Sequence, residues 1–239
     1  MNIKNVLFIF LAIILISALI FHATIKIIPV ELGFADPSAE YNEPIVYHNF
    51  VTEEEADYIK TKAQARFVKS EVMGYKVEEN IRKSQTAWLE KTDPVVRNVI
   101  TRVCAIHDYP FENAEELQVV KYESDGFYKE HHDSVHENDL ASLDFLKTGG
   151  HRKLTMLIYL NDDFSEGGTR FVTLQKDIKP PKYGSILFYP LDKDDRKCHP
   201  SALHAGLPLK SGEKYIANVW IRTNEFSHAQ NNYVYIRGT

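Results

Sequence analysis

The chain has 239 residues, of which 44% are hydrophobic and 26% are charged, so it is long enough for one large or two small globular domains. Its formal net charge is −5 at pH 7, and the absence of a basic stripe argues against a nucleic-acid backbone as the partner. Two cysteines, Cys104 and Cys198, are too few for a disulfide scaffold, and the sequence leaves open whether they are bridged.

The first predicted element is an apolar run near the amino terminus. Residues 6–21 are apolar except for Ser17, and with the apolar positions that follow they are long enough to span a bilayer as a helix. Lys4 precedes the run and acidic residues follow it, which predicts a cytosolic amino terminus and a luminal, endoplasmic-reticulum-like or otherwise translocated domain. A cleaved secretory signal is the alternative, but the run is long for one and no clear cleavage site follows. We expect residues 1–28 to form an uncleaved signal anchor.

The next segment, residues 29–44, has the composition of a linker. It contains three prolines and a glycine, at Pro29, Pro37, Pro44 and Gly33, which break regular structure. A single domain is then expected to fill residues 45–239.

Two helices are predicted in the first part of this domain. Thr52 and Glu55 have the spacing of a capping box, and apolar residues follow at helical intervals, so a helix is expected over 52–68. Asp93-Pro94 has the pattern of a second helix start, because proline is favoured in the first turn. A third, short helix is expected after Asp139.

From Leu117 onward the sequence changes to short runs of β-branched and aromatic residues separated by turn residues such as Gly, Asn and Pro. Many short strands at close spacing are typical of a sandwich or a jelly roll. The expected fold is therefore mainly β with supporting helices. The expected strands are 117–122, 127–133, 154–160, 169–174, 185–189 and 215–222.

A candidate metal site is found at the end of the second of these strands. Alternation along a strand places His131 and Asp133 on one face, while His132 points the other way. Two imidazoles and one carboxylate on one face of an octahedron are the ligand set of iron(II) oxygenases. His204, between two predicted strands, is the best candidate for the third ligand. A short motif of this kind arises by chance in a chain with ten histidines, so the assignment depends on the residues around it.

Lys214 is a candidate anchor for an anionic cosubstrate. It lies ten positions after His204, and Trp220 follows on the same predicted strand. A dicarboxylate bound inside a barrel needs a buried cation, since an unpaired buried carboxylate is costly. Without the surrounding pattern, a solvated lysine in a Gly-Glu-Lys turn would be the simpler interpretation.

Several separate segments together resemble the catalytic core of the prolyl 4-hydroxylases. Residues 117–122 (LQVVKY) and 128–133 (YKEHHD) resemble its first half, and Arg82-Lys83-Ser84 resembles its Arg-x-Ser element. The second half is similar to further stretches that follow in the same order and with similar gaps, at 152–160, 167–171, 179–188 and 199–221. The resemblance covers about residues 45–223, and it implies a double-stranded β-helix, or jelly roll, preceded by a membrane anchor.

The resemblance also implies roles for individual residues. The iron ligands would be His131, Asp133 and His204. The residues that hold 2-oxoglutarate would be Lys214, Tyr122 and Thr169. The polypeptide substrate would be contacted by Tyr128, Arg152 and Trp220.

The implied activity is iron(II)- and 2-oxoglutarate-dependent hydroxylation of peptidyl proline to 4-hydroxyproline. O₂ is consumed, 2-oxoglutarate yields succinate and CO₂, and L-ascorbate serves as the reductant. Two alternatives stay open: a related dioxygenase acting on lysine, a free amino acid or a small molecule, and a non-catalytic jelly-roll binding module. The sequence does not indicate whether a partner subunit is required.

Overall fold

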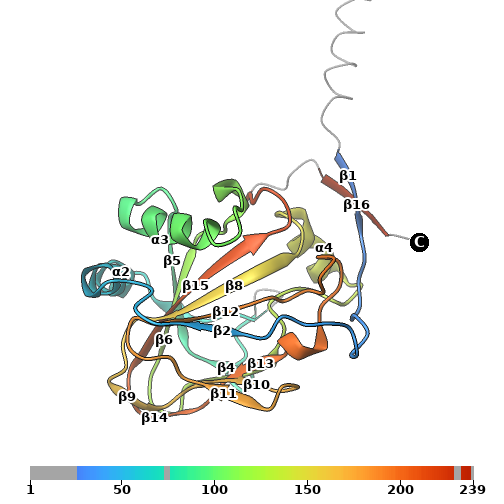
Figure 1. Cartoon of the computed structure of the whole chain (residues 1–239). Helices are drawn as coiled ribbons and strands as arrows, with labels where there is room; N and C mark the ends of the chain where they lie inside the picture. The colour runs from blue at the N-terminus through green and yellow to red at the C-terminus, as the bar shows by residue number, and fades with distance from the viewer. Residues whose placement is uncertain (1–25, 73–75, 229–232, 238–239) are drawn as a thin grey trace, which may run out of the picture.

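Two antiparallel sheets face each other and helices cover the outer side of the larger one (Figure 1). The computed structural model describes residues 26–72, 76–228 and 233–237. The larger sheet has seven strands in the order β2 (Ile45–Tyr47), β12 (Ser185–Phe188), β8 (Arg152–Tyr159), β15 (Lys214–Arg222), β6 (Leu117–Tyr122), β5 (Gln85–Leu89) and β3 (Val68–Lys69). The smaller sheet has five strands in the order β11 (Lys176–Ile178), β10 (Thr169–Phe171), β13 (His204–Gly206), β7 (Phe127–His131) and β4 (Arg82–Lys83).

Two short strand pairs complete the β structure. β14 (Leu209–Gly212) pairs with β9 (Phe164–Glu166), and β1 (Lys26–Val30) pairs in parallel with β16 (Tyr233–Arg237). The predicted architecture, mainly β with supporting helices, is confirmed. The structure also contains short strands that the sequence analysis did not predict, some at the edges of the two sheets and others inside them, such as β13 and β5.

The central strands are buried on both faces, and alternation decides which core each side chain joins. In β6, Val119 packs toward the helices, whereas Val120 packs into the space between the sheets. In β15, likewise, Ala217 packs toward the helices and Ile216 packs into the space between the sheets. Since successive side chains of a strand point to opposite faces, the inner face of β15 carries every second residue from Lys214 to Arg222.

Both long helices begin at the predicted caps. α2 (Glu53–Gln64) has a complete capping box, in which Thr52 and Glu55 exchange side-chain to main-chain hydrogen bonds. It ends before the predicted residue 68, because Val68 joins β3 and pairs with β5. α3 (Pro94–Cys104) starts with the Asp93 carboxylate accepting from two main-chain N–H groups. Both helices pack against the outer face of the seven-stranded sheet.

The remaining helical segments are short. α4 (Leu140–Lys147) is capped by Asp139, as predicted. Single 3-10 turns form at η1 (Phe111–Asn113) and η2 (Pro200–Ala202). Cys104 and Cys198 are both buried free thiols, which answers the question that the sequence left open.

The predicted signal anchor at 1–28 falls almost entirely outside the described residues, which begin at Lys26. Among the helices that the structure describes, none is long and apolar enough to cross a bilayer.

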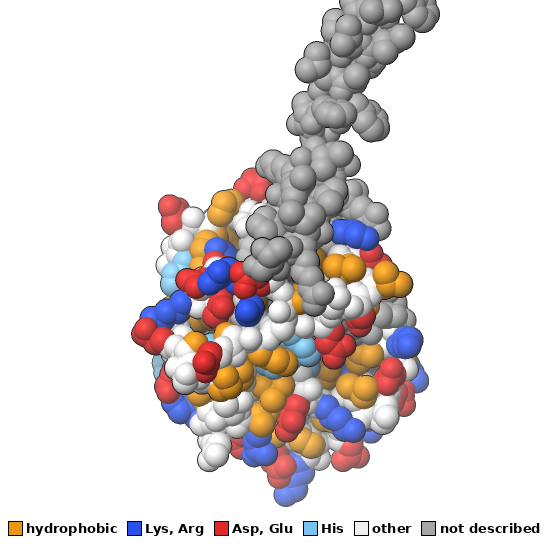
Figure 2. Space-filling model, turned by 90° about the vertical axis from the view of Figure 1, so that its right-hand side faces the viewer, with side chains coloured by type: hydrophobic (Ala, Val, Ile, Leu, Met, Phe, Trp, Pro, Cys, Tyr) orange, Lys and Arg blue, Asp and Glu red, His pale blue; other side chains and the backbone are white. Residues whose placement is uncertain are grey.

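The segment predicted as a linker contacts the domain from Glu31 onward. The Phe34 ring lies 5.1 Å from the His132 ring, and Tyr41 stacks on His199 at 4.6 Å. These contacts lie beside the chain that carries the candidate metal ligands. Ion pairs also join the segment to the domain, at Glu31–Arg196, Glu31–Lys197, Glu40–Lys193 and Glu43–Lys176. Acidic and basic side chains are interspersed on the face shown in Figure 2, in agreement with the pattern of the sequence.

Candidate active site

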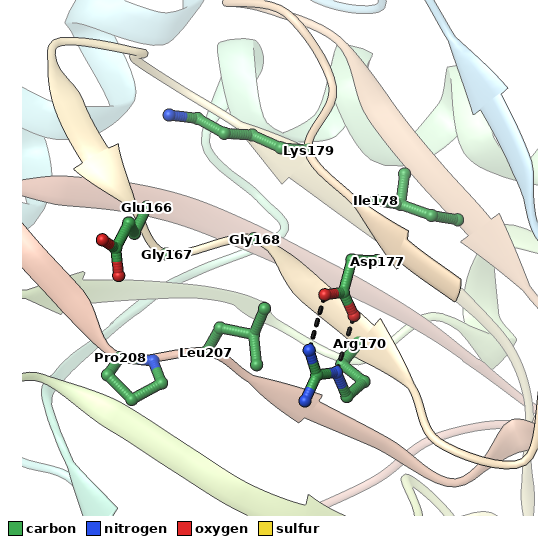
Figure 3. Close-up of a pocket in the computed structure, with 9 residues that line it drawn as sticks. All are labelled: Glu166, Gly167, Gly168, Arg170, Asp177, Ile178, Lys179, Leu207 and Pro208. Carbon is green, nitrogen blue, oxygen red and sulfur yellow. Dashed lines mark hydrogen bonds and ion pairs between the residues drawn. The ribbon is translucent and has the colours of Figure 1, made fainter. Parts of the chain in front are cut away.

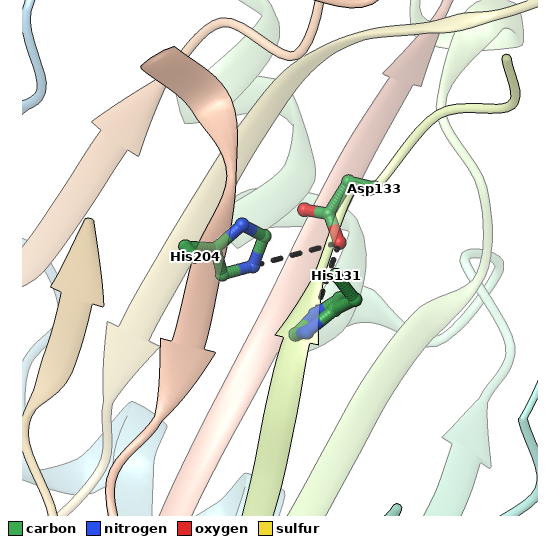
Figure 4. Close-up of side chains that lie close together, drawn as sticks. All are labelled: His131, Asp133 and His204. Carbon is green, nitrogen blue, oxygen red and sulfur yellow. Dashed lines mark ion pairs between the residues drawn. The ribbon is translucent and has the colours of Figure 1, made fainter. Parts of the chain in front are cut away.

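The three predicted metal ligands lie together between the two sheets (Figure 4). His131 ends β7 and His204 begins β13, and the two residues are directly opposite each other in the ladder. Asp133 lies two residues beyond the end of β7, and its Oδ1 is 3.8 Å from the Nε2 atom of each histidine. One ligand atom from each side chain lies within 4.8 Å of the others.

The opposite nitrogen of each imidazole is held by the main chain. The Nδ1 atom of His131 lies 2.8 Å from the carbonyl of Lys129, and Nδ1 of His204 lies 3.0 Å from the carbonyl of Ala202. A carbonyl only accepts, so Nδ1 carries a proton in each imidazole, and Nε2 is the nitrogen directed toward the other ligand atoms. Both rings are therefore oriented with the nitrogen that can bind a metal toward the cluster.

Asp133 is oriented by two donors from the larger sheet. Its Oδ2 accepts hydrogen bonds from the Thr155 hydroxyl, at 2.7 Å, and from the Trp220 indole N–H, at 3.1 Å. Oδ1 remains directed toward the two imidazoles. Burial works to raise the pKa of Asp133, but nearby groups, among them His204, Arg152 and the Thr155 hydroxyl that donates to it, outweigh burial and hold this pKa at about 2. The carboxylate is ionised, which is the form that binds a metal.

Burial and the nearby His204 lower the pKa of His131 well below its ordinary value, so this imidazole is neutral. His132 contacts Phe34 and His136 and takes no part in the cluster of ligand atoms. This is the arrangement that strand alternation predicts, although β7 ends at His131 and Asp133 belongs to the bend that follows.

The three ligands line a cavity of about 830 Å³, and Lys214 lines the same cavity. Lys214 is only 2% exposed, and its Nζ donates to the Gly167 carbonyl at 2.6 Å. The ammonium lies 5.2 and 4.8 Å from the rings of Tyr122 and Tyr159, and no carboxylate pairs with it among the described residues. Burial, assisted by the charge of Lys179, lowers the pKa of Lys214 to about 7.

A buried cation without a counter-ion favours binding of an anion from outside, because pairing removes much of the cost of burying its charge. The other two residues predicted to hold 2-oxoglutarate lie beside Lys214. Tyr122 is opposite it in the ladder, and Thr169 lines the same cavity. The Thr169 hydroxyl is hydrogen-bonded to the Tyr159 hydroxyl at 2.9 Å.

The three residues predicted to contact substrate lie near the metal ligands. The Tyr128 ring stacks on His131 with centroids 3.6 Å apart. The Arg152 guanidinium lies 3.4 Å from the centre of the Trp220 ring. All three line the cavity, and their contact with a substrate stays a prediction.

The structure also gives Arg152 a partner that the sequence analysis missed. The Glu115 carboxylate accepts from Arg152 Nε at 2.6 Å and from Nη2 at 2.7 Å. It also accepts from Arg222 Nε, so one buried carboxylate joins two guanidinium groups.

Thr155 and Tyr159 also support the site and were missed by the sequence analysis. Arg82, which the sequence analysis noted in the Arg-x-Ser element, has its guanidinium 4.6 Å from the Tyr128 ring centre. One signal was present for Thr155, because it is a polar residue inside the apolar run 154–160. The cross-strand register that brings it to Asp133 has no signature in a single sequence.

A second hollow, of about 440 Å³, lies outside the barrel near Gly167 and Gly168 (Figure 3). Its basic groups already have partners: Arg170 forms two hydrogen bonds with Asp177, and Lys179 donates to the Phe164 carbonyl. Polar groups do not converge there as they do around the three ligands, so the larger cavity is the candidate active site.

The donor set of this cavity fits iron(II). Two imidazole nitrogens and one carboxylate oxygen converge from one side, and the cavity leaves the other side open for a cosubstrate. The residues that would hold the metal are His131, Asp133 and His204. Lys214 would supply the positive charge that a dicarboxylate needs.

Comparisons with known proteins agree with this assignment. Residues 117–222 match the sequence profile of the 2OG-Fe(II) oxygenase superfamily. A protein of Acanthamoeba polyphaga mimivirus assigned as a prolyl 4-hydroxylase is 40% identical over 197 residues, covering 82% of this chain and 81% of the relative. Prolyl 4-hydroxylase 1 of Arabidopsis thaliana is 34% identical over 199 residues, covering 74% and 68%.

A solved structure is similar over most of the chain. It is the 2OG complex of the viral collagen prolyl hydroxylase from Paramecium Bursaria Chlorella virus-1. The TM-score is 0.59 and the sequence identity is 30%, with coverage of 79% of this chain and 99% of that chain.

Proposed function

The chain belongs to the prolyl 4-hydroxylase family of 2OG-Fe(II) oxygenases, and from this premise we propose that it hydroxylates proline residues of a polypeptide to 4-hydroxyproline. The required cofactors are iron(II), 2-oxoglutarate and O₂. When they are bound, one oxygen atom of O₂ enters the proline C–H bond, and the other converts 2-oxoglutarate to succinate and CO₂.

One observation carries the proposal. The Nε2 atoms of His131 and His204 and the Oδ1 atom of Asp133 converge in the same cavity as Lys214, a buried cation without a carboxylate partner among the described residues. A binding module that used the three ligands alone would have no need for the buried lysine.

Different side chains have different roles in the proposed reaction. The main-chain carbonyls and the two donors to Asp133 fix the ligands before any metal binds, which lowers the reorganisation needed on binding. Lys214 holds the distal carboxylate of 2-oxoglutarate, assisted by Tyr122 and Thr169. Tyr128, Arg152 and Trp220 line the side on which the polypeptide enters.

The test uses the full chain with iron(II), 2-oxoglutarate and a peptide with proline at alternate positions. We include ascorbate, which we propose as the reductant. We expect succinate release and a mass gain of one oxygen atom that fragmentation assigns to proline. A matched peptide with alanine in place of proline, and one bearing lysine, serve as controls. Succinate release with oxygen on lysine, or with no oxygen on the proline peptide, would contradict the proposal.

We also propose that residues 6–21 anchor the protein in a membrane with the catalytic domain translocated. The length and apolar character of this run support the proposal. Expression of the full chain with isolated membranes, followed by alkaline extraction and protease treatment, tests it. A protein that is released by alkali, or whose domain is digested without permeabilisation, would rule the anchor or its orientation out.

A further inference from the structure

The cavity contains a pair of side-chain amides that the proposed chemistry does not use. Gln118 of β6 and Asn218 of β15 are opposite each other in the ladder, and Asn218 Nδ2 donates to Gln118 Oε1 at 3.0 Å. Their exposed fractions are 6% and 7%, and both line the cavity. On the inner face of β15, Asn218 lies between Lys214 and Trp220, so the pair is on the wall between the cosubstrate anchor and the residues around Asp133.

This pair has hydrogen-bonding capacity left over. After the one bond between them, the Gln118 NH₂ group remains a free donor and the Asn218 carbonyl a free acceptor. Neither group has another hydrogen-bond partner among the described residues. Exchanging the oxygen and nitrogen of both amides would still leave one donor and one acceptor. The pair therefore presents one donor and one acceptor to the cavity, whichever way the amides are turned.

One donor beside one acceptor is the complement of a main-chain peptide unit. Water can satisfy both groups in the free protein, whereas a ligand that covers them must supply an acceptor and a donor of its own. 2-Oxoglutarate carries only acceptors when ionised, so it can satisfy the donor but not the acceptor. A polypeptide supplies both from its backbone.

We infer that Gln118 and Asn218 bind the main chain of the polypeptide substrate, one donating to a carbonyl and the other accepting from an N–H. This inference rests on the proposed function. The neighbouring surface suits a peptide: Trp88 is opposite Gln118 in the ladder, is 43% exposed and lines the same cavity. Val68, on the adjacent edge strand, is also exposed and adds apolar surface.

The acceptor of this pair restricts the sequence of the substrate. Proline has no main-chain N–H, so a proline at the position facing the acceptor would leave a buried carbonyl without a partner. The substrate class is therefore a polypeptide in which the reactive proline has a non-proline residue nearby. Uninterrupted polyproline is disfavoured for the same reason.

The experiment compares peptides of equal length with the full-chain enzyme. One has proline at alternate positions, a second is polyproline, and a set of others carries a single amide-to-ester replacement at each non-proline residue in turn. An ester removes one N–H and leaves the side chains unchanged. We expect one ester position, and polyproline, to raise the peptide KM roughly ten-fold, the scale of one hydrogen bond between uncharged groups. The KM for 2-oxoglutarate should stay at its value with the alternating peptide.

A variant identifies the residue responsible. In Asn218→Leu the peptide KM should rise by a similar factor, and the ester should then have no further effect, as in a double-mutant cycle. Asn98→Leu, at an exposed position of α3, is the matched control. Equal KM values for polyproline and the alternating peptide, or an ester effect that is undiminished in both Asn218→Leu and Gln118→Leu, would overturn the inference. If Asn218→Leu does not fold, the peptide series alone decides. Failure of the wild-type chain to hydroxylate any peptide would instead overturn the proposed function.

Discussion

Two buried carboxylates line the same cavity, and they differ in what their oxygens contact. Glu115 is 3% exposed and Asp133 is 8% exposed. Both oxygens of Glu115 accept hydrogen bonds from guanidinium groups, whereas Asp133 accepts hydrogen bonds from the described residues at Oδ2 only. Oδ1 of Asp133 faces two imidazole nitrogens at 3.8 Å, a separation too long for a hydrogen bond.

This difference separates a structural carboxylate from a ligand. Burial works to raise the pKa of both groups, and nearby positive or polarised groups lower both below their ordinary values. A lowered pKa alone therefore does not identify the functional group. The free lone pair does, since a buried acceptor without a donor has a place for a cation.

The largest expected effect comes from removing the free lone pair of Asp133 while keeping its hydrogen bonds. In Asp133→Asn the remaining oxygen can still accept from Thr155 and Trp220, and the new NH₂ group faces the imidazole lone pairs. We expect hydroxylation to fall more than about 100-fold, beyond the range for loss of an outer contact. The increase in Tm caused by iron(II) under anaerobic conditions should disappear, with the Tm of the metal-free protein nearly unchanged. A retained iron(II) shift would remove Asp133 from the ligand set.

Replacing Glu115 should instead lower the stability of the folded protein. Glu115→Ala leaves the guanidinium groups of Arg152 and Arg222 facing each other without the carboxylate between them, at an expected cost of about 3–5 kcal/mol. Urea unfolding of the metal-free protein measures this cost, and Glu112→Ala, at an exposed position nearby, is the control. Because the pKa of Glu115 is lowered by folding, its contribution is present above the pKa of the unfolded chain. It is lost as the pH falls through the folded value, so the two proteins should converge in acid. A loss below about 1 kcal/mol would contradict the assignment.

The same contrast exists among the cations and predicts a pH dependence. Arg152 is paired with Glu115, whereas Lys214 has no carboxylate partner among the described residues, and its pKa is about 7. Above that pH the free enzyme must take up a proton to hold a dicarboxylate, so the dissociation constant for 2-oxoglutarate should rise about ten-fold per pH unit. Lys214→Arg, which stays charged, should lose this slope even if its affinity is lower. Titration of the iron-loaded protein in the absence of O₂ measures the slope, and a flat wild-type profile would be the contrary outcome.

Helix starts that depend on a capping residue, and strands that show regular alternation of side chains, could be predicted from the sequence. Thr52 and Asp93 start helices as predicted, and the run 117–122 forms β6 with the predicted bounds. His131, Asp133 and His204 lie together, and Lys214 is buried near Tyr122 as the resemblance implies.

Contacts between side chains that depend on the register of strands far apart in the sequence could not be predicted. Thr155, Trp220 and Asp133 meet only because β8 pairs with β15 and the smaller sheet lies across both. Glu115 was not singled out, since its two arginines lie 37 and 107 positions away. The strand β13 was missed because it has three residues, too few to show a period.

The smallest expected effect tests whether the free lone pair of Asp133 depends on its orientation. Trp220→Phe removes one of two donors to Oδ2 but keeps a ring beneath Arg152, so the carboxylate is held by Thr155 alone. We expect iron(II) affinity to fall by about ten-fold, the lower end of the range for an outer contact, since one donor remains. Trp88→Phe is the control. The Trp88 ring centre lies 6.1 Å from that of Trp220, but the Trp88 indole forms no hydrogen bond with Asp133, so the iron(II) affinity of this variant should equal that of the wild type. Adding Thr155→Val to Trp220→Phe should cost more than the sum of the single changes, because the second donor is the only one left to fix the carboxylate. Additive losses would mean that the two donors stabilise the sheet without orienting the ligand.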